Sequence, residues 1–219
     1  MIDFLLPRLH QEGYRFLAIA VVITFILLLI SNFLGLVSFI LTVWIYYFFR
    51  DPERFSINDE SFLLSPADGI VSQITEVKGP EELGLENKEF TRVSIFMNVF
   101  NCHVNRFPSS GKIDKIFYKP GKYLNASLDK SSDENERNYI KFTNSHGDEI
   151  VLVQIAGLIA RRIVCEVKED SEAKQGDRFG IIRFGSRVDL YFNNYKILVK
   201  KNQKMISGET IVARKNQND

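Results

Sequence analysis

The chain carries no charged residue from Leu17 to Phe49, and this run constrains how its N-terminal part can fold. A helix that crosses a bilayer needs about 20 apolar residues, so the run is too long for one simple span. The polar pair Ser31-Asn32 and Gly35 divide it into two apolar pieces, 17–30 and 33–49, each short for a full crossing. The pattern predicts a tight helical hairpin that either inserts into a membrane or rests at its surface.

Charged and aromatic residues around the run indicate its orientation. Arg8 and Arg15 precede it. Arg50 and Arg54 follow it. Because positively charged flanks stay on the cytoplasmic side, the rest of the chain is expected there. Aromatic residues at 44–47 suit a membrane interface, and they would equally suit a buried helix. The alternative is a cleaved signal peptide, but its apolar core is only about 7–15 residues long and ends at a small-residue cleavage site, which this run lacks.

After residue 54 the pattern changes to short alternating runs separated by turn residues, which is typical of strands. The sequence therefore predicts a mainly β (α+β) fold, with 1–54 as a membrane-associating segment and 55–219 as one β-rich domain. A polar stretch at 129–138 is predicted to be a solvated loop. The predicted strands are 69–76, 92–99, 111–118, 139–144, 149–156, 163–168, 179–184, 188–192 and 195–199.

The C-terminal segment 204–213 is similar to the final turn and strand of barrel-sandwich folds, which include lipoyl and biotinyl carriers. The similarity concerns the fold alone. A carrier presents a modifiable lysine at a hairpin tip, and the sequence has no such arrangement, so a carrier function is not favoured. The prediction is a barrel-sandwich-like β domain preceded by an apolar helical hairpin.

Composition excludes several classes of function. The formal net charge is +1, with basic residues dispersed among acidic ones, so nucleic acid is not an expected partner. Cys102 and Cys165 form no CxxC pair, which fits two ordinary thiols in a reducing compartment. The three histidines are scattered, so a catalytic zinc site with three protein ligands is not expected.

The dipeptide Gly185-Ser186 interrupts a strand-like stretch and suggests self-cleavage. A serine hydroxyl that attacks its own preceding carbonyl converts the peptide bond into an ester. Elimination from that ester leaves an N-terminal pyruvoyl group, which can accept electrons. Glycine before the serine leaves the carbonyl uncrowded and tolerates an unusual backbone conformation. A strand bulge or turn is the simpler interpretation of a bare Gly-Ser pair.

Five stretches of the chain, in this order, resemble the phosphatidylserine decarboxylase family, and especially its short bacterial branch. They span nearly the whole chain. The stretches are residues 46–54 (YYFFRDPER), 65–71 (SPADGIV), 96–106 (FMNVFNCHVNR), 154–162 (QIAGLIARR) and 182–192, within which FGSRVDLYF contains the Gly-Ser pair.

This resemblance implies a proenzyme that cleaves itself between Gly185 and Ser186 into chains 1–185 and 186–219, which remain together as a heterodimer. Ser186 would become a covalently bound pyruvoyl group, with no pyridoxal phosphate and no metal. The implied reaction converts phosphatidylserine, a membrane phospholipid, to phosphatidylethanolamine. The implied location is the bacterial inner membrane, with the catalytic domain on the cytoplasmic side. A higher homo-oligomer and an ether-lipid serine head group as substrate remain open.

His103 is the candidate base, because histidine titrates near neutrality and this one follows an apolar strand. Asp68 matches the aspartate of the family's Ala-Asp-Gly sequence, where it would orient a histidine or stabilise its charged form. In the better-known branch a second histidine stands three residues after the first, whereas this chain has Arg106. Either His103 serves both maturation and turnover, or another group assists maturation.

Arg106, Arg161 and Arg187 are candidates for binding the substrate's phosphate or carboxylate, since guanidinium groups bind both. Surface ion pairs are the alternative for each. An α/β-hydrolase is excluded, because its nucleophile elbow needs glycines where this chain has Phe184 and Val188. A soluble amino-acid decarboxylase would have no use for the apolar hairpin. A membrane-tethered, lipoyl-like binding module without enzymatic activity is the remaining alternative, and it predicts an uncleaved Gly185–Ser186 bond.

Overall fold

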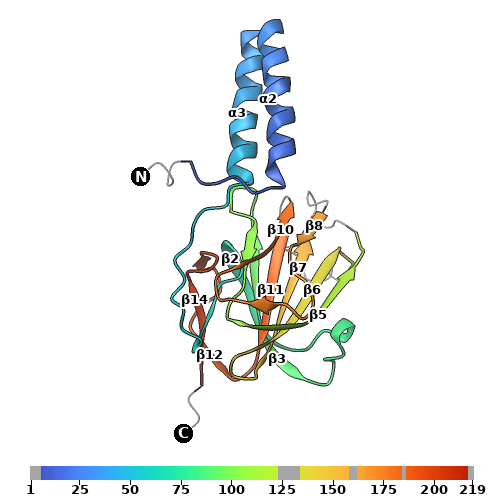
Figure 1. Ribbon diagram of the computed structural model, residues 1–219, viewed down its shortest axis with the longest axis vertical. Helices are drawn as coiled ribbons and strands as arrows, with labels where there is room; N and C mark the ends of the chain where they lie inside the picture. The colour runs from blue at the N-terminus through green and yellow to red at the C-terminus, as the bar shows by residue number, and fades with distance from the viewer. Residues whose placement is uncertain (1–5, 123–133, 158–161, 184–185, 217–219) are drawn as a thin grey trace.

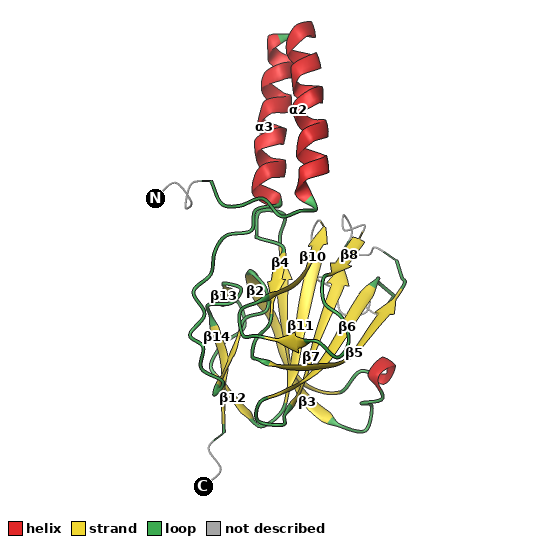
Figure 2. Ribbon diagram, in the orientation of Figure 1, coloured by secondary structure: helices red, strands yellow, loops and turns green. Residues whose placement is uncertain are grey.

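The computed structural model describes residues 6–122, 134–157, 162–183 and 186–216. A pair of helices stands upright on one end of a β domain (Figure 1). Strands dominate that domain and curl around a common interior (Figure 2). The predicted mainly β fold with a preceding apolar helical pair is therefore confirmed.

The helical hairpin is formed by α2 (Gly13–Ile30) and α3 (Asn32–Phe48), joined at Ser31, whose backbone is extended. The chain turns where the sequence analysis placed the break. Helix α2 begins earlier than the predicted piece 17–30, because its first turn continues down to the β domain. There the ring of Phe16 stacks on that of Phe49 at a centroid distance of 5.2 Å.

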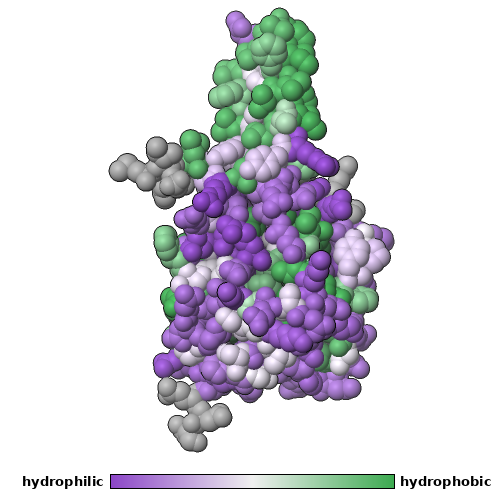
Figure 3. Space-filling view, in the orientation of Figure 1, coloured by the Kyte–Doolittle hydropathy of each residue, from purple (hydrophilic) through white to green (hydrophobic). Residues whose placement is uncertain are grey.

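The two helices contact each other through small and polar residues. The Thr24 hydroxyl lies 2.8 Å from the hydroxyls of both Ser38 and Thr42. A Cβ at Gly35 would collide with Leu28, so glycine permits the close approach of the helices. The outward face is almost entirely apolar and exposed (Figure 3). Helix α2 is long and apolar enough to cross a membrane, and α3 is apolar but slightly shorter. The hairpin is thus polar inside and apolar outside.

Antiparallel strands build three sheets. Their orders are β13-β2-β3-β11-β7-β6-β5-β9, β4-β10-β8 and β1-β14-β12. The strands are β1 (Phe62–Leu64), β2 (Gly69–Lys78), β3 (Glu89–Met97), β4 (Val104–Arg106), β5 (Gly111–Lys119), β6 (Arg137–Asn144), β7 (Glu149–Ala156), β8 (Arg162–Cys165), β9 (Glu172–Ala173), β10 (Arg178–Arg183), β11 (Ser186–Phe192), β12 (Tyr195–Ile197), β13 (Lys204–Met205) and β14 (Ile211–Lys215), with a short 3₁₀ helix η1 (Glu81–Leu83).

Strand β11 is buried along its whole length, and its side chains alternate between two cores. Val188, Leu190 and Phe192 enter the main core. Tyr191 enters a smaller core on the other face of the sheet. Ser186 shares the parity of Val188, so its side chain is directed toward the main-core face.

Each predicted strand corresponds to an observed one, but those predicted at 92–99 and 195–199 end earlier, at Met97 and Ile197, and two further corrections lie nearby. The strand predicted at 163–168 ends at Cys165. The second half of the polar stretch 129–138 is not solvated, since Asn135 and Glu136 are buried. The Asn135 amide donates to Ala156 O at 2.8 Å, and Glu136 accepts a hydrogen bond from Ile163 N at 3.0 Å. Paired partners make burial of these polar groups tolerable. Residues 129–133 lie outside the described residues.

The hairpin joins the β domain through a third apolar core. Phe48 and Phe49, at the end of α3, pack with Cys102, Val104 of β4 and Ile181 of β10. This core fixes the hairpin base against the end of β10.

We expect Phe107→Ala to lower the free energy of unfolding by about 3–5 kcal/mol. The Phe107 ring lies 5.5 Å from that of Phe142 and 5.2 Å from that of Phe179, and nothing polar can fill the space it leaves. Guanidinium unfolding of the detergent-solubilised protein measures the effect. Phe117→Ala is the matched control, since Phe117 is 38% exposed. Equal losses in the two variants would contradict the assignment of Phe107 to the core.

Candidate active site

Ser186 is the first residue of β11 and lies between two buried neighbours. It pairs with Met97 at the end of β3 and with Ala156 at the end of β7. The side chain is fully buried, and among the described residues its hydroxyl has no hydrogen-bond partner. A buried hydroxyl without a partner costs about 1–3 kcal/mol. Such a cost calls for an explanation, and a reactive role is one.

His103 immediately precedes β4 and is also fully buried. Its ring lies 4.3 Å from the ring of Phe48 at the hairpin base. Its carbonyl accepts a hydrogen bond from Ile182 N of β10 at 3.3 Å. His103 is therefore beside the last residues of β10, the strand that leads toward Ser186.

Loop 98–103 connects these two positions. It begins directly after Met97, the residue opposite Ser186, and it ends at His103. Both candidate residues thus lie at the end of the sheet that faces the hairpin. Arg183, the last residue of β10, confirms this placement, because it forms an ion pair with Glu12 and lies over the ring of Phe16.

The hydrogen bond of His103 determines which nitrogen can act as a base. Nδ1 lies 3.0 Å from Asn101 O, which can only accept, so Nδ1 carries the proton. Burial lowers the pKa of His103 from 6.5 to about 3, so the ring is neutral at physiological pH. Nε2 is buried and, within the described residues, has no partner. Its lone pair is available to accept a proton.

Asp68 lies just before β2 and accepts hydrogen bonds from two other groups. Arg54 donates to both carboxylate oxygens, at 3.0 and 2.8 Å. Ser207 N donates to Oδ1 at 2.8 Å. Burial, and after it the charge of Asp68, raises the pKa of the Cys102 thiol to about 11, so Cys102 is an inert thiol beside His103. Asp68 is thus at the same end of the sheet, with Arg54 as its charged partner.

The structure places the arginine candidates differently. Arg106 is buried, and its guanidinium donates to Asp51 at 3.1 Å and to the carbonyls of Gly176 and Pro52, each at 2.9 Å. Arg187 is buried and paired with Asp189 of the same strand at 2.9 Å. These contacts favour structural roles for both. Arg161 and Gly185 lie outside the described residues.

Sequence reasoning missed a row of buried amides on the main-core face of the sheet. The Asn138 amide donates to the Gln154 side chain at 3.0 Å, and Gln154 donates to Asn105 at 2.9 Å. Asn105 in turn contacts the sulfur of Met97, the residue opposite Ser186, at 3.8 Å. The available signal was polar residues inside apolar strands, such as Gln154 in EIVLVQIA.

Comparisons with known proteins identify the family of the chain. A family model described as phosphatidylserine decarboxylase matches residues 41–213. A phosphatidylserine decarboxylase proenzyme of Pelagibacter ubique (strain HTCC1062) is 63% identical over 215 residues, which is 98% of this chain and 100% of that protein. Proteins of the same name from Rickettsia typhi and Rickettsia prowazekii are each 52% identical over 206 residues, 94% of this chain and 89% of theirs.

These matches cover nearly the whole chain, and they show that its class is that of the decarboxylase enzymes. The chain belongs to the phosphatidylserine decarboxylase family.

The buried, neutral His103 predicts an acid-sensitive fold. Below pH 6.5 the unfolded chain takes up a proton that the folded chain rejects until about pH 3, so stability is full above 6.5 and falls as the pH drops toward 3. In a Ser186→Ala background, which keeps the chain in one piece, His103→Leu should lose stability less steeply than its parent from pH 6.5 to about 4.5. Denaturant midpoints at several pH values measure the slopes.

His146→Leu is the control, because His146 lies in an exposed turn after β6. It should keep the slope of the parent. Parallel slopes for the His103→Leu protein and its parent would show that His103 titrates normally in the folded chain.

Proposed function

We propose that this chain is a proenzyme that cleaves itself between Gly185 and Ser186 and then decarboxylates phosphatidylserine to phosphatidylethanolamine. The observation that carries the proposal is a pair of buried groups at one end of the sheet, the Ser186 hydroxyl and His103 Nε2, neither of which has a hydrogen-bond partner among the described residues. One is a nucleophile and the other a neutral base. Membership of the family supplies the reaction and the lipid substrate.

In the proposed maturation, His103 Nε2 takes the proton of the Ser186 hydroxyl, and the oxygen attacks the preceding carbonyl. The other two histidines are committed elsewhere. His10 is paired with Glu166 at 2.9 Å, and His146 contacts Glu60 O from an exposed turn. His103 is therefore the histidine we assign to both maturation and turnover.

The residue environment fits a pyruvoyl group formed from Ser186. The position is buried on the central strand β11, which keeps water and side reactions away. When formed, this group supplies a carbonyl that accepts the electron pair released as carbon dioxide leaves, so the reaction calls for neither pyridoxal phosphate nor a metal. We assign Asp68, with its partner Arg54, to the electrostatics at this end of the sheet rather than to direct contact with the reacting atoms.

The strand pairing supports a stable complex of the two product chains. The short chain, 186–219, would contribute β11, which pairs with β3 and β7 along its length. It would also contribute β14, which lies between β1 and β12. Unfolding would be needed to separate the chains, so we propose that they function as a heterodimer.

We further propose that residues 1–54 attach the enzyme to the bacterial inner membrane and that 55–219 forms the catalytic domain on the cytoplasmic side. An apolar outer face with hydroxyls paired inside suits a lipid environment, where polar groups must be satisfied within the protein. An 18-residue helix is about 27 Å long, close to the roughly 30 Å hydrocarbon thickness. The hairpin can thus insert deeply from one side.

Ser186→Ala should abolish both self-cleavage and decarboxylation. Intact-mass measurement of the wild-type protein under denaturing conditions should give two chains, with the short one lighter by one ammonia than a serine-ended peptide. His103→Ala should slow the cleavage, because it removes Nε2, the base proposed for Ser186. A single uncleaved wild-type chain in a folded sample would overturn the proposal and leave the membrane-tethered binding module.

Leu29→Lys should weaken membrane binding, because Leu29 is 75% exposed near the hairpin tip. A lysine in the middle of a bilayer costs about 2.5–3.5 kcal/mol, and near the tip somewhat less. Flotation with phospholipid vesicles measures the bound fraction. Leu198→Lys is the matched control, since Leu198 is a 47% exposed leucine of the β domain, next to β12. Equal flotation of both variants would show that the hairpin does not enter the bilayer.

A further inference from the structure

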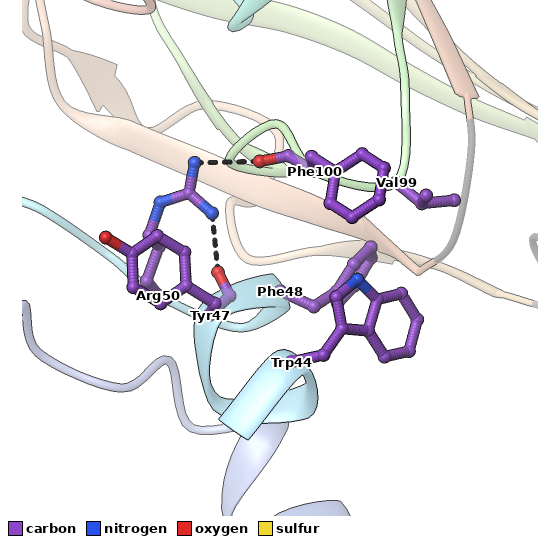
Figure 4. A pocket seen from close by; sticks show the side chains of 6 residues that line it. All are labelled: Trp44, Tyr47, Phe48, Arg50, Val99 and Phe100. Carbon is purple, nitrogen blue, oxygen red and sulfur yellow. Dashed lines mark hydrogen bonds between the residues drawn. The ribbon is translucent and has the colours of Figure 1, made fainter. Parts of the chain in front are cut away.

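A small pocket of about 190 Å³ lies where the hairpin meets loop 98–103. Its walls are aromatic and apolar apart from one guanidinium (Figure 4). The lining residues are Trp44, Tyr47, Phe48, Arg50, Val99 and Phe100. Neither the pocket nor Arg50 was among the substrate-binding candidates that the sequence suggested.

Arg50 is held at the pocket edge by two backbone carbonyls. Its guanidinium donates to Tyr47 O at 2.6 Å and to Phe100 O at 3.0 Å (Figure 4). It also lies over the ring of Tyr47, 4.8 Å from the centroid. An arginine has five N–H donors, so some remain after these two bonds. Within the described residues no carboxylate pairs with Arg50, in contrast to Arg106 and Arg187.

The pocket is next to both the reacting groups and the membrane-facing hairpin. Phe48 forms one wall and also contacts the ring of His103. Val99 follows closely after Met97, which pairs with Ser186. Trp44 belongs to α3, and Phe100 is 70% exposed. A ligand here would have one end toward the bilayer and the other toward Ser186.

We propose that this pocket binds the phosphodiester and glycerol of a glycerophospholipid, with the Arg50 guanidinium on the phosphate oxygens. Trp44 and Phe100 lie against the glycerol and the first acyl carbons, and the chains continue along the hairpin. The head group extends from the phosphate toward Ser186. This assignment deepens the proposed function and rests on it.

Chemistry favours the phosphate over the carboxylate as the partner of Arg50. The carboxylate loses its charge when carbon dioxide leaves, so a cation bound to it would stabilise the substrate more than the transition state. The phosphate keeps its charge throughout the reaction. Binding it contributes equally to substrate and transition state, so the loss of Arg50 should appear in KM rather than in kcat.

The test compares processed Arg50→Ala, Arg50→Gln and Arg50→Lys enzymes on phosphatidylserine in mixed micelles. We expect Arg50→Ala to raise KM about 10- to 100-fold with little change in kcat, as for loss of a charged hydrogen bond. Arg50→Gln keeps a polar side chain with an N–H donor but removes the charge, and it should behave like Arg50→Ala. Arg50→Lys should be intermediate, because lysine keeps the charge but not the planar fork. Arg8→Ala, which removes an exposed charge near the hairpin base, should keep the wild-type KM.

Dihexanoyl phosphatidic acid, which has the phosphate and glycerol without serine, separates phosphate binding from a structural role. Its inhibition constant should rise together with KM in Arg50→Ala and Arg50→Gln. An unchanged inhibition constant, or a loss confined to kcat, would overturn the inference. The intact mass of every sample is measured to determine whether the chain has been cleaved. Failure of the wild-type protein to cleave would refute the proposed function, whereas normal cleavage and turnover with a wild-type KM in Arg50→Gln would refute only the phosphate site.

Discussion

The packing of the hairpin base against His103 is the contact on which the rest of the site depends. Phe48 ends α3, and its ring covers the histidine that precedes β4. Burial there removes water from the ring and keeps it neutral, because a charged imidazolium would be poorly solvated. The apolar hairpin and the proposed base therefore share one apolar core. Any displacement of the hairpin would hydrate the base and change its protonation.

The strand order at the same end of the molecule would allow the proposed cut in the interior of the chain without unfolding. Strand β10 belongs to the three-stranded sheet β4-β10-β8, whereas β11 lies between β3 and β7 in the large sheet. The bond between Gly185 and Ser186 lies in the connection between β10 and β11, which belong to different sheets and are not neighbouring strands. Among the described residues, β10 and β11 do not pair with each other, so the proposed cut separates no two neighbouring strands. Each new end keeps separate supports, since Arg183 is paired with Glu12 and Ser186 is flanked by Met97.

The sequence predicted the elements well because their patterns are local. The uncharged run and its polar break specified the hairpin, and period-two alternation located the longer strands. The start of β11 was placed at Val188 because the Gly185-Ser186 pair indicates an interruption of the strand, yet Ser186 and Arg187 are buried strand residues. Their burial depends on partners distant in sequence, such as Met97 for Ser186. The three-residue strand β4 was missed for a similar reason, since the strand it pairs with among the described residues, β10, is distant in sequence.

The roles of the arginines could not be predicted, because an arginine's role depends on what lies within reach of its guanidinium. Arg106 reaches Asp51 and two carbonyls and becomes a buried clamp. Arg50 follows α3 and reaches carbonyls at the edge of an apolar pocket. The residues that follow Arg50 and Arg106 in the sequence form no pattern that distinguishes the roles of the two arginines. Only the tertiary fold separates them.

Arg106 also bears on how a single histidine can serve maturation. A clamped guanidinium cannot take a proton, so it does not replace the second histidine of the better-known branch. His103, with a pKa of about 3, is a weak base, and a weak base makes serine attack slow. The proposed maturation would happen once in the life of each chain, so a slow step would be tolerable there. Turnover places a different demand on the same ring. After cleavage, the charged carboxylate of phosphatidylserine beside His103 would favour the protonated ring and raise its pKa toward neutrality. One histidine can then act as a base during maturation and as a proton donor during turnover.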